Sequence, residues 1–117
     1  MSYYYILDAE NDLVPVQTWD EYWAWLDRER EARGQQTPIA TLQVARDVWG
    51  ERPNCVSTVF LGLDHNWGDG PPAVFETMVF TNEADDSGQW RYSSWDEAVA
   101  GHGAVVSALR NGQPLPE

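Results

Sequence analysis

Two segments of the chain combine a helix-capping signal with apolar residues at helical spacing. The first begins with the capping box Thr18-Trp-Asp-Glu21 and is predicted to run to about Arg33, with Gly34 as the C′ residue. Trp25 lies off the apolar stripe of this helix. The stripe itself consists of Trp19, Tyr22, Trp23 and Leu26.

The second helix is predicted from another capping box, Ser94-Trp-Asp-Glu97, to about Arg110. Gly101 and Gly103 lie inside this segment and weaken it by roughly 1 kcal/mol each. We expect these glycines to permit a close approach to a sheet.

Runs of branched and aromatic residues elsewhere predict strands. They span residues 3–8, 13–16, 39–49, 55–63, 73–80 and 89–92. The last four are joined by connections too short for helical crossovers, so they are expected to pair antiparallel in sequence order. The sequence therefore predicts one α+β domain over residues 1–112, with an antiparallel sheet of about five or six strands and two helices, followed by a frayed tail over 113–117.

Composition narrows the class of protein. The 117 residues suit one domain, and no apolar run approaches the ~20 residues that span a bilayer. The single cysteine, Cys55, cannot form an internal disulfide, and the N-terminus has no signal-peptide pattern. These features predict a cytoplasmic protein without membrane association, and they leave its oligomeric state open.

Charge is the strongest compositional feature. Nineteen Asp and Glu residues oppose seven Arg and no Lys, and the net charge is −12. Small soluble domains usually carry a net charge of magnitude roughly 2–8. Such a field repels the phosphate backbone, so direct binding of nucleic acid is not expected, whereas basic protein surfaces are attracted. The alternative is a solvated surface that reflects a GC-rich genome, which would also explain Arg in place of Lys.

One long loop, residues 64–72, joins two predicted strands and carries Asp64, His65, Trp67 and Asp69. It does not match an EF-hand, because its sixth position is Asp and its twelfth is Phe. It is either a wide hairpin turn held by local bonds from Asp64, or a binding loop that presents Trp67 with His65 beside it.

The far end of the first helix offers a second candidate binding surface. Asp27, Glu29 and Glu31 lie beyond the apolar stripe and are expected to project into water. Trp25 is expected near this surface, although large aromatic side chains are mostly buried. Aromatic residues dominate interaction hot spots, and an acidic rim around them would suit a basic partner.

Glu76 lies in the middle of a strand that is apolar on both faces. A carboxylate at such a position needs an arginine or hydrogen-bond donors. It is expected either to form a structural ion pair with Arg91 or to serve as a polar anchor in a ligand pocket.

No catalytic or metal-binding pattern is visible. Ser57 lacks the G-x-S-x-G context of a nucleophile, and His65 and His102 lack the spacing of metal ligands. The sequence therefore predicts neither enzymatic activity nor a metal or other cofactor.

A resemblance adds a biological setting. The segments Val56–Trp67, Gly70–Pro72 and Phe75–Phe80 resemble a family of small uncharacterised proteins that bacteriophages and prophages encode, largely in GC-rich hosts. The later Arg91-Tyr-Ser93 and Trp95–Ala98 segments match the same pattern. The resemblance covers roughly residues 55–103 and implies a phage accessory protein without implying any chemistry.

Three functions remain open at this point. The first is a protein-binding inhibitor of a host defence complex, similar to an anti-CRISPR protein, that offers acidic charge to a basic groove. The second is a sponge for nucleotide signals, with Trp67 stacking on a base and Arg91 or Arg52 holding phosphates. The third is an uncatalogued enzyme.

Overall fold

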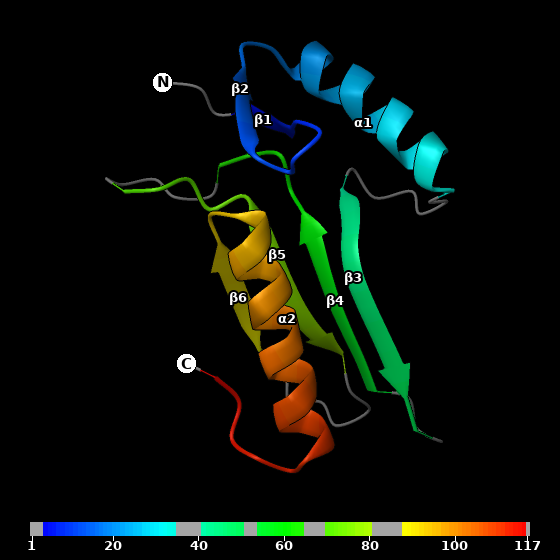
Figure 1. The fold of residues 1–117 in the computed structure, drawn as a ribbon, viewed down its shortest axis with the longest axis vertical. Coiled ribbons are helices and arrows are strands. Elements are labelled where there is room, and N and C mark those ends of the chain that lie inside the picture. The colour runs from blue at the N-terminus through cyan, green and yellow to red at the C-terminus, as the bar shows by residue number, and fades with distance from the viewer. Residues whose placement is uncertain (1–3, 35–40, 51–53, 65–69, 81–87, 117) are drawn as a thin grey trace.

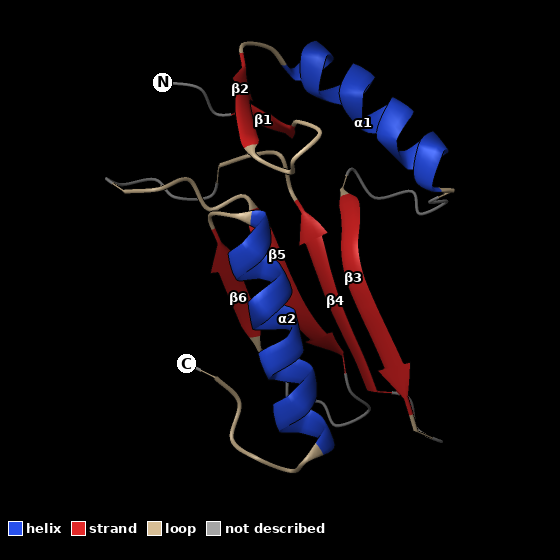
Figure 2. Cartoon of the chain, viewed as in Figure 1, coloured by secondary structure: helices blue, strands red, loops and turns tan. Residues whose placement is uncertain are grey.

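The described part of the chain folds into six antiparallel strands and two helices, the α+β class that the sequence predicts. The computed structural model describes residues 4–34, 41–50, 54–64, 70–80 and 88–116. In chain order the elements are β1 (Tyr4–Leu7), β2 (Leu13–Val16), α1 (Trp19–Arg33), β3 (Leu42–Trp49), β4 (Asn54–Phe60), β5 (Phe75–Phe80), β6 (Gln89–Tyr92) and α2 (Trp95–Arg110) (Figures 1 and 2).

The strands form two sheets, where one was expected. β3, β4, β5 and β6 pair in sequence order, as predicted, whereas β1 and β2 form a separate hairpin. The hairpin meets the chain just beyond the end of β4, where the Tyr5 amide donates to the Gly62 carbonyl at 2.7 Å. It thus lies beyond the end of the larger sheet and does not extend it sideways (Figure 1).

The predicted N-cap bonds form at both helices, although neither glutamate accepts from the N-cap amide as in a complete capping box. Thr18 Oγ1 accepts from the Glu21 amide at 3.2 Å, and Ser94 Oγ accepts from the Glu97 amide at 3.1 Å. The Glu21 carboxylate accepts from the Gln17 amide, one residue before the expected partner. Gly34 ends α1 with φ 66°, a left-handed conformation that glycine adopts without strain.

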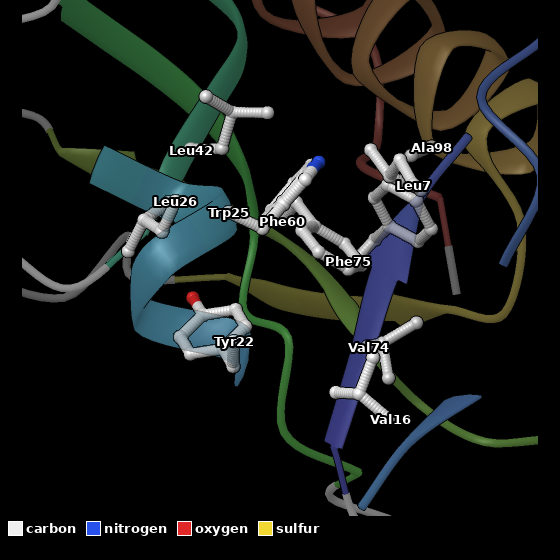
Figure 3. Packing of buried hydrophobic residues seen from close by; sticks show 10 residues of the cluster. All are labelled: Leu7, Val16, Tyr22, Trp25, Leu26, Leu42, Phe60, Val74, Phe75 and Ala98. Carbon is white, nitrogen blue, oxygen red and sulfur yellow. The ribbon is translucent and has the colours of Figure 1, made fainter. Parts of the chain in front are cut away.

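Most of the core lies where α1, the hairpin and one end of the larger sheet meet. Figure 3 shows ten of its side chains, among them Trp25 against Phe60. The surface position expected for Trp25 is therefore wrong, because its side chain is 7% exposed and its ring meets Phe60 at a centroid distance of 5.6 Å. The buried side of α1 is centred on Tyr22, Trp25 and Leu26, which leaves Trp19 at the margin with 41% exposure.

α2 packs across one face of the larger sheet (Figure 1). Val105 of this helix forms a second apolar cluster with Val56 and Val79. At Gly101 a Cβ atom would overlap the ring of Tyr92 on β6, so this glycine does permit the expected close approach. Gly103 faces open space and plays no such part.

A β-bulge in β3 decides which side chains face α2. The register with β4 shifts between Gln43 and Ala45, so that Val44 is the extra residue. The Gln43 amide group fills the irregularity, donating to the carbonyls of Ala45 at 2.7 Å and Thr58 at 2.9 Å. Because side chains alternate from there on, the shift turns Asp47 toward α2 and Arg46 to the opposite face.

The C-terminal segment packs back on the domain, whereas the sequence predicted a frayed tail. Leu115 contacts the second apolar cluster, and Trp90 Nε1 donates to the Pro116 carbonyl at 2.8 Å. Among the described residues, neither helix is long and apolar enough to cross a membrane.

Candidate functional site

Most of the acidic side chains in the described residues lie at one end of the molecule. This acidic end comprises the β1–β2 turn, α1 and the first turn of α2 (Figure 1). It also contains three arginines, all in α1. Its ten carboxylates, exposed in every case but Glu29, belong to Asp8, Glu10, Asp12, Asp20, Glu21, Asp27, Glu29, Glu31, Asp96 and Glu97. The remaining described residues contain equal numbers of acidic and basic side chains, three carboxylates and three arginines. The described charge is therefore polarised along the molecule.

A ridge of carboxylates runs along α1. Asp20, Asp27 and Glu31 are seven and four residues apart, so they lie on one helical face, opposite the buried side. Glu29, which was expected to project with them, instead pairs with Arg33 at 3.4 Å and is partly covered. Of the three acidic residues predicted for this surface, Asp27 and Glu31 therefore belong to it and Glu29 does not.

A polar cleft lies between the β1–β2 turn and the start of α2. Its volume is about 190 Å³, and Glu10, Asp12 and Asp96 line it. The turn is held by Asp8, whose Oδ1 accepts from the amides of Glu10 at 2.9 Å and Asp12 at 3.0 Å. Three carboxylates around one concave site would receive a cationic side chain, such as the guanidinium of a partner's arginine.

The predicted binding loop is only partly described. Asp64 Oδ1 accepts from the Ala73 amide at 3.0 Å, which is the local backbone bond expected of a wide hairpin turn. His65, Trp67 and Asp69 lie outside the described residues, so a binding role for them stays a prediction.

Glu76 and Arg91 face each other across β5 and β6 and form the expected ion pair. Arg91 Nε donates to Glu76 Oε2 at 3.1 Å, and Gln89 Nε2 donates to the same oxygen at 2.6 Å. Glu76 is only 8% exposed, and these two donors stabilise its buried carboxylate. The pair lies on the face of the sheet that α2 leaves uncovered.

The structure also contains a buried chain of polar groups that sequence reasoning missed. Thr77 Oγ1 lies 2.5 Å from Thr58 Oγ1, which in turn lies 2.7 Å from His102 Nδ1. His102 Nε2 lies 2.6 Å from Asp47 Oδ2. An ionised carboxylate only accepts, so the ring proton belongs on Nε2. A neutral ring then accepts from Thr58, and Thr58 accepts from Thr77.

Thr58, His102 and Asp47 have the residue types of a nucleophile–histidine–acid triad. The geometry of this hydrogen-bonded series nevertheless supports a structural role. Thr58 is fully buried, so its hydroxyl cannot reach a substrate in this conformation. Both ring nitrogens of His102 are engaged, and the chain ties α2 to β3, β4 and β5. The only sequence signal was a histidine between two glycines of a helix, which does not identify its partners.

No group of three or more His, Cys, Asp or Glu side chains that could hold a metal ion occurs in the described ranges. A comparison of the chain with protein-family models, with curated proteins and with solved structures finds no match. Arguments about function therefore depend on the residues themselves.

Proposed function

We propose that this chain is a small binding protein whose acidic end occupies a basic groove of a partner protein. The observation that carries the proposal is the concentration of exposed carboxylates on the α1 ridge and around the adjoining cleft. In line with the resemblance to phage proteins, the partner is a host defence complex that binds nucleic acid, and the chain inhibits it by competing for that groove.

Electrostatics favours this assignment over direct binding of nucleic acid. A phosphate backbone is repelled by a chain of net charge −12, whereas a groove lined with Lys and Arg is attracted to it over several ångströms. Complementary charge raises the association rate more than the affinity and makes that rate sensitive to salt.

The test begins with capture of partners from a lysate of a GC-rich bacterial host, followed by association kinetics with the captured protein. The on-rate should fall about tenfold or more between about 50 and 300 mM salt. The chain should displace DNA or RNA from the partner while binding neither itself.

A pair of charge reversals locates the surface. Asp27→Lys with Glu31→Lys should slow association strongly and change the free energy of unfolding by no more than about 0.5 kcal/mol per site. The matched control, Glu83→Lys with Asp86→Lys, changes the net charge equally elsewhere in the chain. If both pairs slow association alike, or if the rate does not depend on salt, the acidic end is not the binding surface.

A further inference from the structure

The face of the larger sheet opposite α2 is open in the described part of the chain. Its side chains follow from the register, because residues paired across strands share a face. One row consists of Val48, Cys55 and Phe80. The next row consists of Arg46, Ser57, Met78 and Gln89, and the third of Gln43, Val59, Glu76 and Arg91. We call this surface the open face.

The open face carries exposed apolar side chains in the row at one end of the sheet. Val48 and Phe80 are 47% and 52% exposed, and they are two of the four large hydrophobic residues exposed in the described part of the chain. A groove of about 250 Å³ runs between Val59, Met78 and Phe80. A contiguous apolar patch on a protein surface commonly marks a site that binds a partner.

The charge of the open face is opposite to that of the molecule. Arg46 and Arg91 lie at its two sides, and its one carboxylate, Glu76, is already bound by Arg91 and Gln89. Arg46 is exposed and forms no ion pair within the described ranges. Two copies packed face to face would bring these like charges together, which disfavours a symmetric dimer through this surface.

We propose that the open face is a docking site for an acidic amphipathic helix of a partner protein, with apolar side chains in the groove and carboxylates on Arg46 and Arg91. The opposite face already packs a helix, α2, so the open face is the side of this sheet on which a partner's helix could pack. This surface is distinct from the acidic end and binds a partner of opposite charge.

The spacing of the arginines defines the helix. Strands lie about 4.8 Å apart, so β3 and β6 are separated by about 14 Å across the sheet. Two glutamates about three helical turns apart are separated by roughly 16 Å and match this distance. Arg91 retains guanidinium N–H groups beyond the Nε that binds Glu76, and its side chain is 42% exposed.

The test is amide chemical-shift mapping of the whole labelled chain with a synthetic probe helix of about 16 residues. The probe carries leucines on one face and two glutamates about three turns apart, and a twin carries lysines in place of the glutamates. We expect the acidic probe to shift the amides of Ser57, Met78 and Phe80. We expect the lysine twin to shift amides of the acidic end.

Two variants with the same change of charge decide the outcome. Arg46→Glu should weaken binding of the acidic probe about tenfold or more, and Arg46→Gln should weaken it less. Arg28→Glu, on exposed α1 surface, should leave it unchanged. The proposal is overturned if the Arg46 and Arg28 variants bind alike, if millimolar acidic probe shifts no amide of the open face, or if those amides respond to protein concentration alone, which would indicate a second copy there.

Discussion

The buried polar chain makes a quantitative prediction about stability. Thr58 is completely buried, and its hydroxyl has two partners, Thr77 Oγ1 at 2.5 Å and His102 Nδ1 at 2.7 Å. Valine has nearly the same shape without the hydroxyl, so Thr58→Val leaves both partners buried and unsatisfied. Each unsatisfied buried polar group costs about 1–3 kcal/mol. We therefore expect Thr58→Val to lower the free energy of unfolding by about 3 kcal/mol.

Thr77→Val is the matched control. Thr77 is as buried as Thr58, but it is the last residue of the hydrogen-bonded series and contacts only Thr58 within it. This substitution removes one bond and leaves the Thr58 donor on His102, so the expected loss is about 1 kcal/mol. Urea denaturation should resolve the difference, and thermal unfolding should show a fall of roughly 10 °C for Thr58→Val. The double variant should lose less than the sum of the two single losses, since both act on one bond.

A spectroscopic measurement tests the direction of the hydrogen bonds independently. Long-range ¹⁵N–¹H correlation at pH 8 should show His102 protonated at Nε2, with Nδ1 acting as an acceptor. In Thr58→Val the Nδ1 signal should move while the Nε2 proton remains. The reasoning is refuted if Thr58→Val costs no more than Thr77→Val, or if the ring proton is on Nδ1.

Three further predictions concern the fold. Gly103→Ala should stabilise the protein by about 0.5–1 kcal/mol, because the site is open and alanine favours the helix. Gly101→Ala should destabilise it, because the added Cβ atom would overlap the ring of Tyr92. Urea denaturation measures the change in the free energy of unfolding for each variant. Trp25→Ala should cost about 3–5 kcal/mol in the same assay, and Trp19→Ala, at the exposed margin of the same helix, much less. Burial raises the pKa of Tyr22, so the folded state holds this proton more tightly than the unfolded state, and the free energy of unfolding should fall as the pH rises above about 10. Tyr22→Phe should reduce that alkaline loss.

Helix boundaries and strand order were predictable because their signals are local. Thr18 and Ser94 cap the helices by accepting from amides three residues further along the chain. The connections between β3, β4, β5 and β6 are too short for crossovers, so strands that follow one another pair antiparallel. The division into two sheets was not predictable in this way. It depends on where the hairpin meets Gly62, a contact between residues far apart in the chain.

The candidate sites show the same limit. The Glu76–Arg91 pair follows from one strand pairing, so alternation alone suggested it. The His102 chain joins three strands to a helix, and Asp47 reaches it only because the bulge at Val44 changes the phase of β3. Trp25 was misplaced because the apolar stripe of α1 is broad, and only packing against Phe60 decides which of its edges is covered.

The two proposed surfaces can be told apart by the sign of their response to salt. A basic partner approaching the acidic end is attracted by the whole chain, so added salt should slow its association. An acidic helix approaching the open face is repelled at long range by the net charge of −12 and attracted only at contact by Arg46 and Arg91. Screening weakens the long-range term most, so salt should speed this association before it weakens the bound state. Stopped-flow rates for the two probe helices, measured from about 20 to 300 mM salt, should therefore change in opposite directions. If both rates fall as salt is added, both helices bind the same surface. That result would contradict the proposal that the open face binds a partner separately from the acidic end.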